Sequence, residues 1–492
     1  MEFSNFIHNL FSFDFNNKMI LTGGTFLLLF TVFLVIFAFL YQNRLIRTLY
    51  IILFSLFFYY KLNGLYFLVL FIPITVDYFA AIKIYESKLK KTKNLWFAIS
   101  IISNIGLLFY FKYTNFFIES FCTLKGVDFT PLKIIIPLGI SFYTFRTISY
   151  IIDVYRNEME PTHDYTDYAF YMTFFPLLIS GPITRAKFFL PQLHKRPIVT
   201  NKQVSKGLFL IIIGLVKKAV IADYLSQYND LVFADPGNYT GFENLMAIYG
   251  YTAQIYFDFS GYTDIAIGIA TIIGFNIGIN FNKPYHALNI TDFWRRWHIS
   301  LSLWLRDYLF SPMSLNFRNI GKSGLIIAIV ITFIICGIWH EGSLSFIIWG
   351  LLNGLILGYE ILTAKIRKRI KNKTKPSVYN TLSWIITFHV IVALWIVFRA
   401  PTLNDAQLMV HQIFFNMNWA YAIPFFDVRF LFLMMLIIGF AFYAIPAKWF
   451  PEITQRFINT PFLIKAIVFI VAAQLIIQFQ SADVQPFLYG KF

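Results

Sequence analysis

Long apolar stretches alternate with short polar loops along almost the whole chain. A helix that crosses the hydrocarbon core of a bilayer needs about 20 mostly apolar residues. The stretches that approach or exceed this length are 19–41, 46–61, 64–85, 95–119, 131–152, 206–226, 243–273, 322–339, 343–363, 379–399, 427–446 and 463–480. The pattern therefore predicts an all-α polytopic membrane protein with about 11–12 transmembrane helices.

Two regions depart from this pattern. The stretch 166–184 is interrupted by Pro176 and by the pair Gly181-Pro182, so we expect a broken or re-entrant segment there rather than a clean span. Residues 286–312 carry too many charges to face lipid, although they are rich in Trp and Leu. An interfacial helix is the expectation for this second region.

The composition leads to the same class of protein. Hydrophobic residues make up 58% of the 492 residues, charged residues only 13%, and the mean hydropathy is +0.63. A soluble domain carries about 25% charged residues, so this chain has too much apolar surface for a water-soluble core. We expect one integral membrane domain over residues 1–492, with its core at about 95–400 and C-terminal helices and a tail at 401–492.

The net charge of +16 arises largely from short basic loops between apolar runs. The loops with this composition are 88–93, 187–206 and 365–375. We place all three in the cytoplasm, which puts both chain ends outside. Membrane lipid and an anionic cytoplasmic substrate fit this distribution better than nucleic acid does. With two cysteines and no zinc spacing, P-loop or dinucleotide fingerprint, neither a disulfide framework nor a bound metal is expected.

The first polar block within an apolar stretch contains Asp258, Ser260 and Asp264. Two interpretations of these residues are open. They form either an interhelical polar network that fixes packing, or the polar wall of a reaction chamber that receives substrate.

The second block contains Asp292, Trp294, Arg295, Arg296, Trp297 and His298. On one helix begun by Asn289 or Thr291, Trp294, Trp297 and His298 would share a side. Asp292 has the helical spacing to pair with either arginine. The block is either an interfacial helix whose arginines reach lipid phosphates, or a positive vestibule that binds an anionic donor such as coenzyme A.

The third block is Trp339-His340-Glu341-Gly342, at the seam between two apolar stretches. An ionisable side chain at membrane depth is costly and marks a functional site by default. A neutral imidazole is the usual general base near pH 7. A second histidine, a neighbouring indole and nearby glycines favour catalysis over a lone interhelical hydrogen bond.

The tail after the last span ends in Pro486-Phe-Leu-Tyr489-Gly-Lys-Phe492. A short aromatic end suits an interfacial anchor. Tyr489 also offers a hydroxyl outside the membrane. An aryl ester lies between a thioester and an alkyl ester in energy, so this residue is a candidate acyl relay.

Taken together, these blocks resemble the membrane-bound O-acyltransferase (MBOAT) family, in its branch of alginate and peptidoglycan O-acetyltransferases and the teichoic acid D-alanyl transfer protein. The resemblance rests on the segments Pro137-Leu-Gly-Ile-Ser-Phe-Tyr-Thr-Phe145, Ile151-Ile-Asp-Val-Tyr-Arg156, Phe174-Phe-Pro-Leu-Leu-Ile-Ser-Gly-Pro182, Gly214-Leu-Val-Lys-Lys218, 258–264, 292–298, His340 and 486–492.

The resemblance implies a multi-helix fold in which a cytoplasmic and an extracytoplasmic funnel meet at a thin wall. It implies that His340 is the catalytic histidine, that His298 is a second active-site histidine, and that Tyr489 carries the acyl group transiently. The family usually has Trp-His-Gly where this chain has Glu341 after His340. That extra carboxylate either modulates the histidine or points away from it.

The sequence therefore leads to one hypothesis. The protein is an O-acyltransferase of the bacterial cytoplasmic (inner) membrane that moves acetyl from cytoplasmic acetyl-CoA to an extracytoplasmic cell-envelope polysaccharide. The residues that would line the substrate and coenzyme A funnel are Arg295, Arg296, Trp294, Trp297, Trp339, Asp258, Ser260, Asp264 and Asp292. An exported SGNH-hydrolase-like partner would complete the transfer. The alternatives are D-alanyl transfer to teichoic acid-type polymers, acylation of a lipid or protein, and transport of an acylated lipid-linked sugar.

Overall fold

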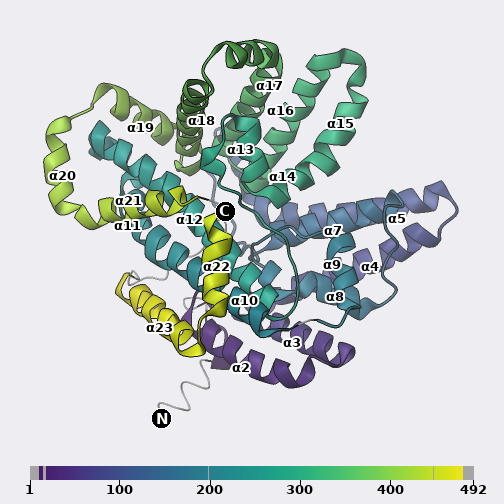
Figure 1. Ribbon diagram of the computed structural model, residues 1–492. Coiled ribbons are helices and arrows are strands. Elements are labelled where there is room, and N and C mark those ends of the chain that lie inside the picture. The colour runs from purple at the N-terminus through teal and green to yellow at the C-terminus, as the bar shows by residue number, and fades with distance from the viewer. Residues whose placement is uncertain (1–9, 15–17, 198, 447, 480–492) are drawn as a thin grey trace. The chain divides into compact units, whose positions relative to one another are not determined.

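The computed structural model describes residues 10–14, 18–197, 199–446 and 448–479 (Figure 1). These residues form helices and contain no strand, which confirms the expected all-α class. The helices group into two compact units. One comprises Met1–Ile211 with Ile265–Gly278, and the other Ile212–Asp264 with Ile279–Phe492.

The first unit is built mainly from the N-terminal half of the chain. Its elements are α2 (Gly24–Leu40), α3 (Arg44–Asn63), η1 (Gly64–Leu70), α4 (Phe71–Glu86), α5 (Lys90–Leu108), η2 (Phe109–Tyr113), α6 (Thr114–Lys125), α7 (Ile140–Tyr155), α8 (Tyr165–Thr173), η3 (Phe175–Leu177) and α9 (Ala186–Leu193). The short pair α8 and η3 confirms the broken segment expected at 166–184. Most of its residues are buried, although neither piece has the length of a span.

The expected span at 131–152 is wrong in its first half. Helix α7 begins only at Ile140, and residues 127–137 form a loop. Gly139 has a φ of +86°, and a Cβ at this position would lie 1.9 Å from the carbonyl oxygen of Leu178. Only glycine fits such a site, so the helix cannot extend backwards through it.

The second unit contains the C-terminal half. Its elements are η4 (Val216–Ala222), α11 (Asp223–Ala234), η5 (Pro236–Asn238), η6 (Pro284–His286), α13 (Ile290–Arg296), α14 (Ile299–Leu305), η7 (Arg306–Phe310), α15 (Ser311–Asn316), η8 (Arg318–Ile320), α16 (Gly321–His340), α17 (Leu344–Lys373), α18 (Pro376–Arg399), α19 (Leu403–Phe415), η9 (Trp419–Tyr421), α20 (Ala422–Val428), α21 (Phe430–Ala444), α22 (Trp449–Asn459) and α23 (Phe462–Phe479). Two further helices, α10 (Asn201–Leu215) and α12 (Gly241–Ile272), run through the boundaries between the units.

Six helical stretches in the described part of the chain are long and apolar enough to cross a membrane. They are Arg44–Glu86, Lys90–Lys125, Arg318–His340, Leu344–Lys373, Pro376–Arg399 and Phe462–Phe479. A seventh is reached if α20 and α21, which meet at a 92° bend, form one broken span. The protein is therefore a multi-pass membrane protein, and fewer of its helices than the apolar pattern predicted are long enough to cross on their own.

Two of the predicted spans, 46–61 and 64–85, fall within the one helical stretch Arg44–Glu86, in which the 3-10 segment η1 joins α3 to α4. Other apolar stretches contain a π-helical segment. The predicted span 206–226, for example, consists of the end of α10, the π-helical η4 and the start of α11. Hydropathy reports how apolar a segment is, but not whether its helix is continuous.

Helices α16 and α17 pack side by side through glycines (Figure 1). A Cβ on Gly337 would lie 2.1 Å from the carbonyl oxygen of Phe346, and one on Gly350 would lie 2.2 Å from that of Phe333. Small residues allow this backbone approach, as they do at many helix interfaces in membranes. The close packing fixes the end of α16, where His340 lies.

Candidate active site

His340 is the last residue of α16 and is 3% exposed. Four aromatic rings surround its imidazole. The ring centroids lie 4.8 Å away for Trp339, 5.3 Å for Phe398, 5.4 Å for Trp349 and 6.2 Å for Phe346. His340 thus lies among aromatic side chains at the end of a helix long enough to span a membrane.

His298 is fully buried and lies at a break between two short helices. Helix α13 ends before it and α14 begins after it, and His298 has the left-handed backbone angles φ 42° and ψ 55°. The expectation that Trp294, Trp297 and His298 share one side of a single helix is therefore wrong. The predicted start of this helix is confirmed, because the Asn289 side chain accepts a hydrogen bond from the backbone N–H of Asp292 at 2.7 Å.

Trp339 contacts both histidines. Its ring centroid lies 6.4 Å from that of His298 and 4.8 Å from that of His340. Phe259 of α12 meets the His298 ring edge-on at 4.7 Å. Burial lowers the pKa of His298 to about 3, so this imidazole is neutral at neutral pH. The structure thus brings together the two histidines that the sequence analysis selected.

The remaining tryptophans of the second block lie in the same aromatic cluster. Trp294 meets Trp349 at 5.8 Å, which is the indole that also touches His340. Trp297 is 1% exposed and lies 5.1 Å from both Phe281 and Trp395. These rings exclude water from the neighbourhood of the histidines.

Helix α17 holds α13 through polar side chains that the sequence analysis missed. The carboxylate of Glu360 accepts hydrogen bonds from the backbone N–H groups of Ile290 at 2.8 Å and Thr291 at 3.1 Å, and from the Thr291 hydroxyl at 2.6 Å. The Asn353 side chain accepts one from the indole N–H of Trp294 at 3.2 Å. Glu360 thus satisfies otherwise unpaired donors at the start of a helix, where a negative charge is also favoured. A lone carboxylate within an apolar stretch was the available signal.

A cavity of about 300 Å³ opens beside α13. Its lining is Thr291, Trp294, Arg295, Ile299, Ser302, Leu303, Leu305, Arg306, Phe310, Ile329, Thr332, Phe333 and Leu357. Arg295 supplies positive charge, and Trp294 and Phe333 are among the aromatic walls. Arg306 also lines the cavity, but its guanidinium is held by the Asp307 carboxylate at 2.6 Å. The arrangement suits an anionic molecule that also carries an apolar part.

The two adjacent arginines of the second block differ in their surroundings. Arg296 donates to the Asp292 carboxylate at 3.0 Å and to the carbonyl oxygen of Asn282 at 3.5 Å. It is absent from the lining of the cavity that holds Arg295. Among the predicted pairings, Asp292 with Arg296 is thus the one in the structure, and it supports a structural role for both residues.

The carboxylates of the first block form ion pairs with lysines of η4. Asp264 lies 2.7 Å from Lys217, and Asp258 lies 2.6 Å from Lys218. Ser260, on the same helix, is 2% exposed. Asp258 immediately precedes Phe259, which contacts His298. This arrangement supports the first of the two interpretations, a polar network that fixes packing.

Two further predicted residues complete the set. Glu341 is half-buried and extended, in the turn that joins α16 to Ser343 at the start of α17. The backbone N–H of Ser343 donates to the Glu341 carbonyl oxygen at 3.0 Å, which closes the turn. Tyr489, the candidate acyl relay, lies outside the described residues.

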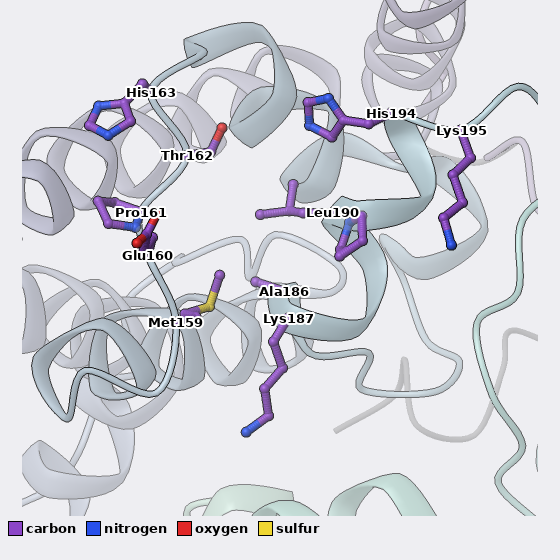
Figure 2. Close-up of a pocket in the computed structure, with 11 residues that line it drawn as sticks. Met159, Glu160, Pro161, Thr162, His163, Ala186, Lys187, Leu190, His194 and Lys195 are labelled. Atoms are coloured by element: carbon purple, nitrogen blue, oxygen red, sulfur yellow. The ribbon is translucent and has the colours of Figure 1, made fainter.

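A larger cavity of about 600 Å³ lies in the first unit (Figure 2). The loop 159–163 faces α9 across it, and His163, Lys187, His194 and Lys195 contribute to its lining. Lys187 pairs with Glu158 at 3.1 Å, and His194 with Asp167 at 3.0 Å. None of the predicted site residues lines this cavity.

Comparison with known proteins finds a family match in the part of the chain that contains this site. Residues 155–400 match the model of the membrane-bound O-acyltransferase family. The chain is 36% identical over 420 residues to the peptidoglycan O-acetyltransferase of Helicobacter pylori, covering 77% of this chain and 79% of the relative. It is 38% identical over 366 residues to the probable alginate O-acetylase AlgI of Pseudomonas aeruginosa, covering 72% and 67%.

A further relative is the teichoic acid D-alanyltransferase of Bacillus subtilis, which is 30% identical over 353 residues, covering 69% of this chain and 86% of the relative. The matched family segment contains both buried histidines, the aromatic cluster and the helix that holds α13. The family match and these relatives, which each align with more than two thirds of the sequence, show that the chain belongs to the membrane-bound O-acyltransferase family and is an acyltransferase.

Proposed function

We propose that this enzyme transfers acetyl groups from cytoplasmic acetyl-CoA across the cytoplasmic membrane for O-acetylation of an extracytoplasmic cell-envelope polysaccharide. The observation that carries the proposal is the pair of buried imidazoles, His298 and His340, which contact the same indole of Trp339. Two relatives with the highest identities cited above are named for O-acetyl transfer to peptidoglycan and to alginate.

The cavity beside α13 supports an anionic donor. Coenzyme A carries phosphates on one end and an apolar arm that ends in the thioester. Arg295 would bind phosphate through forked hydrogen bonds, and the walls that include Trp294 would cover the arm. At about 300 Å³ the cavity is at the lower end of ligand pockets, so it would hold part of the donor.

The proposed chemistry is acyl transfer with one general base. His340 takes the proton from an acceptor hydroxyl, and the resulting oxygen nucleophile attacks the thioester carbonyl. The carbon–sulfur bond breaks, an ester forms, and the proton leaves with the coenzyme A thiol. His298, which stays neutral, positions or polarises the thioester.

The acceptor side of the reaction rests on the family resemblance. Tyr489 is the candidate first acceptor, since its phenolic ester would keep enough energy for a second transfer. An exported SGNH-hydrolase-like partner would then place the acetyl group on the polysaccharide.

D-alanyl transfer is the competing function, because a teichoic acid D-alanyltransferase is also a relative, at 30% identity. Transport without chemistry is disfavoured, since the chain belongs to a family of acyltransferases. The donor separates the two transfer reactions. Acetyl-CoA would serve the first, and a carrier protein loaded with D-alanine would serve the second.

The experiment uses cells that lack the chromosomal copy and carry wild type, His340→Ala or the control His389→Ala, which changes an exposed histidine of α18. Ester-linked acetate is released from the envelope polymers by mild alkali and quantified, and membrane vesicles are assayed for coenzyme A release from acetyl-CoA. We expect H340A to lower both signals by roughly 100-fold or more and H389A to leave them near wild type. Full acetylation by H340A, or ester-linked D-alanine in place of acetate, would overturn the proposal.

A further inference from the structure

The backbone of His298 is an outlier. Of the residues that the structure describes, Asn157, Lys283 and His298 are the non-glycine residues with positive φ. A side chain in the left-handed region is strained, and such strain persists only where surrounding contacts fix it. The contacts that fix His298 therefore bear directly on the geometry of the site.

Three consecutive residues, 280–282, bind the chain on both sides of His298. Before it, the N–H of Asn282 donates to the carbonyl oxygen of Arg296 at 2.9 Å. After it, the N–H of Ile299 donates to the carbonyl oxygen of Asn280 at 2.9 Å. Phe281 packs between these two bonds, 5.1 Å from the ring of Trp297 and 5.0 Å from that of Phe259. Phe259 in turn contacts the His298 imidazole.

The side chain of Asn280 adds two hydrogen bonds to these backbone contacts. Its oxygen accepts a hydrogen bond from the Ser300 N–H at 3.2 Å and another from the Ser300 hydroxyl at 2.6 Å. Because a backbone N–H can only donate, the amide oxygen must be the atom that faces Ser300. Asn280 is fully buried, and its amide nitrogen has no hydrogen-bond acceptor among the described residues. The side chain thus serves α14 as an acceptor, in the manner of a helix cap supplied from elsewhere in the chain.

We infer that Asn280 is a positioning residue that holds His298 in its left-handed conformation through Ser300 and Ile299. This inference rests on the proposed role of His298 in acyl transfer. Asn280 acts on the acyl group only through the histidine. Loss of its side-chain oxygen removes both hydrogen bonds to Ser300, while the backbone bond to Ile299 remains. The loosened first turn of α14 lets His298 relax to an ordinary backbone conformation, which turns the imidazole away from Trp339.

The test compares Asn280→Ala, Asn280→Asp, His298→Ala and the double variant N280A/H298A, with Asn244→Ala as the control. Asn244 is equally buried in the second unit, and its side chain binds three backbone carbonyl oxygens far along the chain from His298. Each variant is purified and its thermal midpoint, kcat and KM for acetyl-CoA are measured. Asn280→Leu, which preserves volume without an acceptor, replaces N280A if that variant does not fold.

We expect N280A to lower kcat by roughly 10- to 100-fold while KM stays within about twofold, since misplacement of a catalytic group acts on the chemical step. N280D keeps the acceptor oxygens and should retain most activity. The double variant should be no slower than H298A, because residues that act as one unit do not have additive effects.

The outcomes separate an error about His298 from an error about Asn280. If H298A has normal activity, the proposed role of His298 is wrong whatever the Asn280 variants do. If H298A is slow and N280A is normal, the inference about Asn280 alone is wrong. It is also overturned if the two effects multiply in the double variant, or if N280D is as slow as N280A.

Discussion

The two histidines of this site are held in opposite ways. His340 ends a regular helix of 20 residues that packs, backbone against backbone, on a helix of 30 residues. His298 lies between two helices of seven residues each, in a strained conformation fixed by separate hydrogen bonds. One is positioned by continuous apolar packing, and the other by a few polar contacts from residues distant in sequence.

The difference teaches where each part of the site is sensitive. The helix packing that positions His340 involves many residues, and it is disrupted when volume is added at a tight contact. The position of His298 depends on a few individual hydrogen-bond acceptors, and it is lost when one of them is removed.

Gly337→Leu should disrupt the α16–α17 contact, because a Cβ there would lie 2.1 Å from the carbonyl oxygen of Phe346. We expect it to cost more than about 3 kcal/mol of stability, since the backbone must move. The measurement is the thermal midpoint of purified protein together with its yield in membranes. The control is Gly106→Leu in α5, where an added Cβ meets nothing within 4 Å. Equal midpoints for the two variants would contradict the packing argument.

Glu360→Ala should release the start of α13, because the carboxylate accepts three hydrogen bonds there. Removal of a helix cap that leaves buried donors unpaired costs about 2 kcal/mol. We expect a lower thermal midpoint and a kcat reduced by roughly tenfold. Glu360→Gln, which keeps acceptor oxygen, should fall between wild type and E360A. Activity of E360A equal to that of the surface control Glu119→Ala would show that α13 does not need this cap.

Trp294→Phe keeps an aromatic ring but removes the indole N–H that binds Asn353 at 3.2 Å. The loss of this buried hydrogen bond should cost about 1 kcal/mol. We expect a correspondingly small drop in thermal midpoint and a few-fold drop in activity. Trp419→Phe, at a position 66% exposed, is the matched control. An unchanged W294F would mean that the indole N–H does not help to position α13.

Acid should destabilise the protein partly through His298. Burial lowers its pKa in the folded state to about 3, below the ordinary value of 6.5. Unfolding therefore takes up a proton below pH 6.5, and stability falls as the pH drops from there towards 3. Between pH 6.5 and 5.5 this histidine should account for about 1 kcal/mol.

The measurement for this last prediction is the thermal midpoint at the two pH values for wild type, His298→Asn and His389→Asn. Asparagine does not titrate, so H298N should lose part of the difference between the midpoints. The prediction fails if H298N and wild type show the same difference. His389 lies on an exposed surface and controls for the general effect of removing a histidine.

The same contrast explains how much the sequence could predict. The apolar stretches 243–273, 322–339, 343–363 and 379–399 each match a helix, although the structure extends the third well beyond its predicted end. The pattern is sufficient in these regions because regular burial and helical continuity coincide. The motifs around His340 and His298 also identified the residues that the structure brings together around Trp339.

The conformation of the second block could not be predicted in this way. Its residues have helical spacing, yet the helix breaks at His298, because Asn280 and Asn282 bind the backbone on either side. The cap on α13 comes from Glu360, 70 positions from Ile290 in the sequence. Such long-range partners leave no local pattern, so only the fold reveals them.

Helix α17 sets the distance between the two parts of the site. From Trp349, which touches His340, to Glu360, which anchors α13, it is one uninterrupted rod of about 16 Å. The distance between His340, the proposed base, and α13, the helix that precedes His298, is therefore set by the number of helical residues between Trp349 and Glu360. Insertions or deletions in the neighbouring connections, such as the turn at Glu341, should change the path of the chain into α17 without changing this distance. A single residue inserted between Trp349 and Glu360 would rotate one contact by about 100° relative to the other and take the two halves of the site out of phase.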